Sequence, residues 1–243
     1  MNLNADILEQ GFALDNREDV IRFDALIDAY AAQKEFMSLK HISLINAYDY
    51  FQLRQDGGKL FAALLDIHIN FLLLHSDIVA ASKAWGSDTV ETGSVLDSEE
   101  IFFRKMEVHK FNSSFIFRYR ALWDKLMGFT VLYFVPNKYE DFVSARSRRN
   151  SFKKIFSSNG GLPHDFVVVL NDSLGDFDDN FRTPEAHGTG RLRKRSFIMQ
   201  SLLESPTIEL SGHWNFVLQY VVAIGKLFSS SEKKVDEDVV RSK

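Results

Sequence analysis

The sequence predicts an all-α protein, a bundle of about eight to ten helices. Three observations indicate this fold class. Apolar residues recur at helical spacing through most of the 243 residues, whereas strand alternation and βαβ units are missing. Only four Pro interrupt the chain, which suits long helices. The 22 Phe predict an aromatic core, because each Phe buries a large area.

In the first half of the chain, we expect helices over residues 17–32 and 35–54, and one or two helices over residues 59–85. Glu18 and Asp19 stand in the first turn, where acidic side chains suit the positive end of the helix dipole. Gly57 and Gly58 end the second helix, and the third is too apolar to lie on a surface. Residues 86–98, GSDTVETGSVLDS, form a polar loop and the best candidate boundary within the fold.

The second half begins with the longest predicted helix, residues 99–134, which Pro136 ends. NKYEDFVSA starts another helix, and further helices are expected over residues 146–156, 191–204 and 212–228. The segment 166–180 stays open: FVVVL fits a short strand, whereas the acidic stretch after it favours a helix or loop. We expect one compact domain over residues 1–228 and a flexible tail over residues 229–243.

Composition excludes several classes of protein. The absence of Cys rules out disulfides and Cys-ligated zinc or iron–sulfur sites. The N-terminus lacks the basic start and apolar run of a signal peptide, and the apolar windows are shorter than the roughly 18–20 residues that span a bilayer. The expectation is therefore a bacterial cytoplasmic protein without a membrane partner.

Charge is distributed unevenly along the chain. Residues 1–100 carry 7 Lys and Arg against 17 Asp and Glu, a net charge of −10, and residues 101–200 carry 17 against 10, a net charge of +7. Two interpretations stay open: the halves attract each other within one fold, or a basic surface meets phosphate or another acidic partner.

The most basic segment, FRTPEAHGTGRLRKRSF, contains an R-x4-H motif made of Arg182 and His187. A guanidinium suits two-pronged contact with phosphate, and an imidazole gains and loses a proton near neutral pH. Together they suit metal-free phosphodiester cleavage. Thr183 and Pro184 predict a helix start there, as N-cap and first residue, and a helix N-terminus favours anions. The alternative is a structural loop in which Arg182 and His187 bond to acidic neighbours.

Candidate substrate-binding residues come from two further basic segments. Arg118, Arg120 and Asp124 interrupt an apolar helix, and Arg120 and Asp124 have the i,i+4 spacing of an ion pair. They either lock the bundle or line an interior cleft. In GRLRKRSF we expect Arg191 and Arg195 on one helix face and Arg193 elsewhere. A second basic cluster consists of Arg146, Arg148, Arg149, Lys153 and Lys154.

No motif indicates a metal or a cofactor. The acidic run 172–179 lacks the spacing of an EF-hand loop, and Walker A, G-x-S-x-G and H-E-x-x-H motifs are absent from the sequence.

The segments FRYRALWDKLMG and FRTPEAHGTGRLRK, within residues 112–197, together resemble an uncharacterised group of bacterial all-helical proteins. More distantly, the helical topology and the R-x4-H motif resemble the HEPN superfamily. Many of its members are metal-independent ribonucleases of toxin–antitoxin and anti-phage systems, often active as dimers. The resemblance implies that Arg182 and His187 are the catalytic pair. Pro184, Gly188 and Gly190 depart from the family pattern, in which the motif lies within a longer helix.

Two functional hypotheses remain. The first is a HEPN-like protein that acts on RNA or a nucleotide, by metal-independent phosphodiester cleavage in a toxin or defence system. The second is a non-catalytic helical binding or scaffold protein, such as an antitoxin, an immunity protein or a stress-system partner. The first hypothesis allows a homodimer, and the second requires a protein partner.

Overall fold

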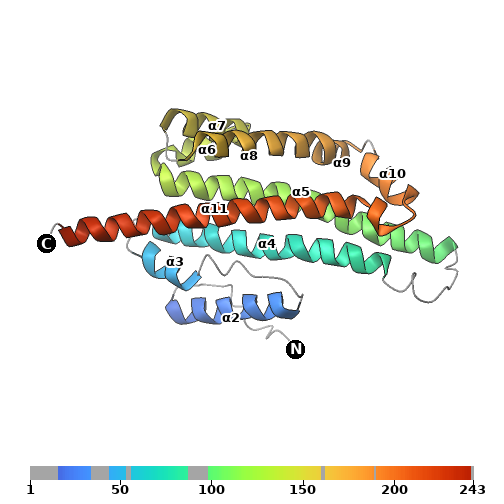
Figure 1. Ribbon diagram of the computed structural model, residues 1–243, viewed down its shortest axis with the longest axis horizontal. Coiled ribbons are helices and arrows are strands. Elements are labelled where there is room, and N and C mark those ends of the chain that lie inside the picture. Colours follow the sequence, from blue (N-terminus) through green and yellow to red (C-terminus); the bar gives the residue numbers. More distant parts are fainter. Residues whose placement is uncertain are drawn as a thin grey trace. The chain divides into compact units, whose positions relative to one another are not determined.

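The computed structural model describes residues 16–33, 44–52, 56–86, 98–159, 162–188 and 190–241. Helices account for nearly all of these residues, and none of them forms a strand. The prediction of an all-α, multi-helix protein is therefore confirmed (Figure 1).

The chain divides into two compact units, residues 1–65 and residues 66–243. The division falls inside helix α4, Gly57–Trp85. The boundary favoured from the sequence was the loop 86–98, most of which lies outside the described residues. A single domain over residues 1–228 stays a prediction.

The first unit contains α2, Arg17–Gln33, and α3, Leu44–Phe51. Asn16 caps α2, because its side-chain oxygen accepts a hydrogen bond from the backbone N–H of Asp19 at 3.0 Å. Arg17 pairs with Asp49 at 3.0 Å and joins the two helices. The helix predicted over 17–32 is confirmed, whereas residues 34–43 of the second predicted helix lie outside the described part of the chain.

The core of the second unit is aromatic, as the sequence predicts. Helix α5, Ser98–Phe134, packs against α11, Pro206–Arg241. The buried ring of Trp123 meets the ring of Tyr220 edge-on at 4.7 Å, and Tyr119 lies 5.6 Å from His213. Contacts between aromatic rings therefore join α5 to α11.

Two further helices pack on α5: α6, Tyr139–Val143, and α7, Arg148–Asn159. Helix α8, His164–Phe177, packs on α7. The 3₁₀ turn η1, Pro136–Lys138, separates α5 from α6. The segment FVVVL is helical, which resolves the open choice. Its apolar residues belong to a buried stripe at helical spacing: Val167, Leu170, Leu174 and Phe177.

Helix α8 continues without a break into a π-helical turn, η2, Asp178–Arg182, and then into α9, Thr183–Ala186 (Figure 1). The amide of Thr183 donates to the carbonyl of Asp178, five residues back. Pro184 explains this turn, because its ring would clash with the carbonyl four residues earlier in a regular helix. The predicted helix start at Thr183 is wrong: Thr183 is already helical (φ −64°, ψ −47°), so no helix N-terminus is available there to bind an anion.

The last helices differ from their predicted bounds. Helix α10, Arg191–Ile198, is shorter than the predicted 191–204, because Met199 is extended (φ −59°, ψ 142°) and the 3₁₀ turn η3, Leu202–Glu204, follows. Helix α11 begins at Pro206, six residues before the predicted start, and its backbone stays helical to Arg241. The flexibility of residues 229–243 stays a prediction.

Within the described ranges, α4 is the one helix that is long and apolar enough to cross a membrane. With 29 residues, α4 is longer than the apolar window recognised in the sequence. The expectation that this segment is too short to cross a bilayer therefore does not hold for α4. Half of its most apolar stretch is nevertheless buried, and Phe71 stacks on Trp214 of α11 at 5.1 Å, as in the core helix of a bundle. A cytoplasmic location stays a prediction.

Phe177→Ala should lower the free energy of unfolding by about 3–5 kcal/mol, because it empties a fully buried ring site between Tyr119 and Phe181. Urea denaturation, monitored by far-UV circular dichroism, measures the change in the free energy of unfolding. Val169→Ala on the same helix is the matched control, since its side chain is 53% exposed. Equal losses in the two variants would contradict the packing described for α8.

Candidate functional site

Arg182 is the last residue of η2, and its side chain is 47% exposed. Its Nη1 lies 3.8 Å from Oδ1 of Asp178, one turn earlier. Asp178 has a second cationic neighbour, since its Oδ2 accepts a hydrogen bond from Nε of Arg120 at 3.3 Å. Oδ1 of Asp178 is buried and accepts no hydrogen bond. Arg182 therefore shares its carboxylate with another guanidinium.

Arg120 lies at the centre of a chain of charges. Its side chain is only 11% exposed, and its Nη1 donates to Oδ1 of Asp124 at 2.5 Å. Nη1 of Arg148, on α7, lies 3.9 Å from Oδ2 of the same carboxylate. We call this set the Arg120 network: Arg148, Asp124, Arg120, Asp178 and Arg182. It joins α5, α7 and η2, and it contains three cations for two anions.

The predicted i,i+4 ion pair of Arg120 and Asp124 is confirmed. The sequence could not reveal the partners that α7 and η2 bring to it, because Arg148 and Asp178 are far from α5 along the chain. Arg149 also approaches the last turn of α8: its Nη1 would lie 2.8 Å from a Cβ at Gly175. A side chain at residue 175 would displace this guanidinium.

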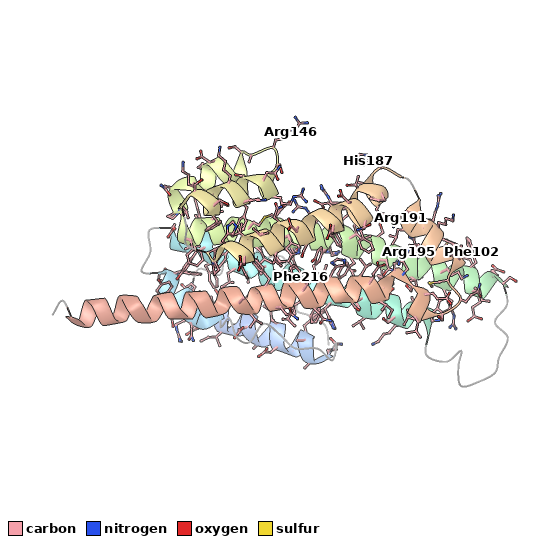
Figure 2. All side chains as sticks on the ribbon, turned by 45° about the horizontal axis from the view of Figure 1, so that its top comes forward. Phe102, Arg146, His187, Arg191, Arg195 and Phe216 are labelled. Carbon is pink, nitrogen blue, oxygen red and sulfur yellow. The ribbon has the colours of Figure 1, made fainter. Side chains whose placement is uncertain are left out.

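His187 ends α9, and its side chain is exposed at the outer edge of the unit (Figure 2). Its backbone N–H donates to the carbonyl of Thr183 at 3.0 Å. At about 100° per residue, the five steps from Arg182 to His187 turn the helix by about 140° beyond one full turn. The two side chains therefore leave the helix in different directions, and one chain does not direct both at one phosphoryl group.

The register between α5 and the η2–α9 segment supports this conclusion. Oγ of Ser113 donates to Oε1 of Glu185 at 2.8 Å. Arg120, seven residues after Ser113, bonds to Asp178, seven residues before Glu185, so the two segments run antiparallel. The face that carries Asp178, Arg182 and Glu185 thus lies along α5. His187, two residues after Glu185, projects away from α5. The structure brings Arg182 together with Arg120 and Asp124, and not with His187.

Arg118 lies on another face of α5. Its Nε is 3.1 Å from Asp77 of α4, and the hydroxyl of Ser114 also donates to Asp77, at 3.0 Å. Burial raises the pKa of Asp77, and the contacts with Ser114 and Arg118 oppose this shift. Arg118 therefore ties α5 to α4 and lies apart from the Arg120 network.

The sequence predicts Arg191 and Arg195 on one face of α10, but the two side chains differ in their surroundings. Arg191 and Arg193 are exposed, whereas Nη2 of Arg195 lies 2.5 Å from Oε2 of Glu209 on α11 (Figure 2). Among the described residues, no ion pair neutralises Arg191, Arg193 or Lys194. The α7 and α10 clusters do not merge, because α7 packs on α8 whereas α10 follows α9. Four aspartates of the α8–η2 segment are exposed as well: Asp165, Asp172, Asp176 and Asp179.

Sequence reasoning missed His213, a half-buried residue of α11. Its ring meets Tyr119, Phe177 and Phe181 edge-on, at 5.6, 4.9 and 5.4 Å. Burial lowers the pKa of His213, and the nearby carboxylate of Glu209 partly opposes this shift. Helical spacing places His213 four residues after Glu209, but nothing in the sequence shows that three rings from other helices surround it.

In the described part of the chain, no three His, Asp or Glu side chains are grouped so that they could hold a metal ion. No family model, curated protein or solved structure matches the chain.

Arg120→Ala should cost about 3–5 kcal/mol of unfolding free energy, because it leaves two shielded carboxylates without their central cation. Arg182→Ala, which removes a half-exposed and longer-range contact, should cost at most about 1 kcal/mol. Chemical denaturation of both variants tests this order. A smaller loss for Arg120→Ala than for Arg182→Ala would show that the network does not hold the three segments together.

His213 should make the protein less stable in mild acid. Its lowered pKa means that the unfolded chain binds more protons than the folded chain below the ordinary pKa of 6.5. This contribution is complete above that pH and is lost as the pH falls through it. His213→Phe should flatten the dependence of unfolding free energy on pH between 7 and 5, by up to about 1.4 kcal/mol per pH unit. An unchanged slope would assign the acid sensitivity to other groups.

Proposed function

We propose that the protein acts on RNA, with Arg182 as the phosphate ligand and His187 as the proton-transfer group of a metal-independent cleavage. The observation that carries this proposal is the half-exposed guanidinium of Arg182, whose carboxylate partner is shared with the buried Arg120. Asp178 lies 3.3 Å from Arg120 but 3.8 Å from Arg182, so Arg182 keeps most of its capacity to bind an anion.

The chemistry needs no group beyond these side chains and the RNA itself. The imidazole of His187 accepts the proton of a ribose 2′-OH, whose oxygen attacks the adjacent phosphorus. The bond to the 5′-oxygen breaks, and this oxygen takes a proton to leave as a hydroxyl. Arg182 balances the negative charge that develops on the phosphoryl oxygens. The products are a 2′,3′-cyclic phosphate and a 5′-hydroxyl.

The divergence of the two side chains adds a requirement. Since Arg182 and His187 leave one helix about 140° apart, the proposal combines Arg182 of one chain with His187 of a second copy. Both side chains are exposed, which such a shared site needs. The HEPN resemblance, in which dimers bring two motifs together, supports the same arrangement.

A second candidate function is non-catalytic binding of a protein partner. The four exposed aspartates of the α8–η2 segment favour it, because a surface of mixed charge suits a protein partner better than a phosphate backbone. In this hypothesis, Arg182 and His187 contribute only to docking.

Cleavage of a labelled RNA in the presence of EDTA tests the first proposal. Wild type should cleave, and Arg182→Ala and His187→Ala should each lose activity by several orders of magnitude. If the site is shared between two chains, an equimolar mixture of the two inactive variants should recover about a quarter of the wild-type rate, because half of the dimers hold one intact site.

The outcomes separate the hypotheses. Variants that are inactive alone and remain inactive when mixed would contradict the shared site. A wild-type protein that cleaves no RNA would remove the enzymatic proposal and leave the binding candidate. For that candidate, capture of the partner should weaken steeply as salt rises, because a charge-driven contact is screened.

A further inference from the structure

Helix α10 and the start of α5 lie side by side at one end of the second unit, which Phe102 and Arg191 mark in Figure 2. Nζ of Lys105, on α5, donates to the carbonyl of Phe197, in the last turn of α10, at 2.9 Å. The ring of Phe197 lies 5.5 Å from the ring of Phe102 and 6.4 Å from the ring of His109. These contacts hold the last turn of α10 against the first turns of α5.

Large apolar side chains are exposed around this contact. Phe102, Phe103 and Met106 are 48%, 55% and 45% exposed, and Ile198, directly after Phe197, is 62% exposed. The ring of Phe103 lies 5.9 Å from the ring of Phe102, and Met106 follows Phe102 by one helical turn. We call these five residues, which adjoin one another across the two helices, the α5–α10 patch. Exposed apolar side chains that gather in this way mark an interaction surface, whereas scattered ones need no explanation.

Cations of α10 lie beside the patch on the same helix. Arg191 and Lys194 are exposed and precede Ile198 by seven and four residues, so the three side chains share the solvent-facing side of α10. Arg193 is exposed as well, and its Nη2 would lie 3.1 Å from a Cβ at Gly190, so its guanidinium folds back toward the start of the helix. Helix α10 itself carries no acidic residue. Its outer side is therefore cationic up to the point where the patch begins.

The carboxylates at this end of the unit do not cancel that charge. Glu99 stands in the first turn of α5, where the helix dipole offsets its charge. Three others are paired with cations that lie outside the exposed side of α10: Glu100 with Arg104, Glu107 with Lys110, and Glu209 with Arg195.

We propose that the α5–α10 patch binds the surface of an anionic lipid membrane, with its apolar side chains among the acyl chains and the α10 cations against the lipid phosphates. Charge complementarity favours this occupant, because exposed apolar groups joined to a cationic helix face are the arrangement that inserts at an anionic interface. The sequence-based expectation of no membrane partner rested on membrane-spanning segments, whereas this contact is peripheral. It does not depend on the proposed cleavage of RNA.

Two other occupants fit the patch less well. Bases of RNA stack on flat rings, and the side chains of Met106 and Ile198 offer none. A protein partner needs a surface shaped to fit the patch, whereas fluid acyl chains accept side chains of any shape.

Sedimentation of the full chain with lipid vesicles tests the proposal. Vesicles with about one-third phosphatidylserine should bind the protein roughly tenfold more tightly than vesicles of phosphatidylcholine alone, because each basic residue near an anionic surface adds attraction. Ile198→Glu and Lys194→Glu should each weaken binding to the anionic vesicles by about tenfold or more. Ile198→Trp should bind at least as tightly as wild type, since Trp favours the membrane interface, and misfolding would not produce this result.

Val169→Glu on α8 and Lys154→Glu on α7 are the matched controls, because they make the same changes of charge at exposed positions away from the patch. Each should change vesicle binding by less than about twofold. Losses in the controls as large as those in the patch variants would assign binding to overall charge and overturn the patch as the site.

The remaining outcomes also decide the proposal. Wild type that does not bind anionic vesicles would overturn it, as would wild-type binding by both Ile198→Glu and Lys194→Glu. If wild type ignores vesicles and Lys194→Glu weakens its binding to a single-stranded RNA, the α10 cations serve RNA instead. A dimer that Ile198→Glu converts to a monomer would show that a second copy covers the patch, and would overturn the lipid surface as its occupant.

Discussion

The ion pairs of Arg120 determine how the second unit presents its surface. This guanidinium is almost completely shielded and lies between Asp124 on its own helix and Asp178 on η2. A shielded charge is costly unless carboxylates surround it, so the position of η2 against α5 is tightly constrained. Arg148 reaches the same cluster from α7. The orientation of Arg182 at the surface follows from this buried contact, because Asp178 and Arg182 are one turn apart.

A proline determines the second constraint. Pro184 cannot continue a regular helix without a clash, and the π-helical turn before it lets the helix run on to Ala186. The R-x4-H motif therefore lies at the end of one continuous helical segment, residues 164–186, with His187 directly after it, and not at a new helix start. The same continuity directs Arg182 along α5 and His187 away from it. If the helix ended before Thr183, the helical backbone would not fix the directions of the Arg182 and His187 side chains relative to each other.

The surface that results combines features that composition alone does not distinguish. The cations of α7 and α10 lie at separate places along the α8–α9 segment, because Arg149 approaches Gly175 whereas α10 packs beside α9, so no long basic track forms.

The all-α fold, the bounds of α2 and α5, and the aromatic core were determined by the sequence itself, because each rests on local spacing of apolar residues. The pair of Arg120 and Asp124 was also predictable, since both residues lie one turn apart on one helix. Only tertiary structure decided that Asp178 and Arg148 complete this pair, that three rings surround His213, and that Arg182 and His187 diverge. These features depend on helix packing, on a proline-induced change of helical pitch and on register between distant segments. None of these leaves a periodic signal in the chain.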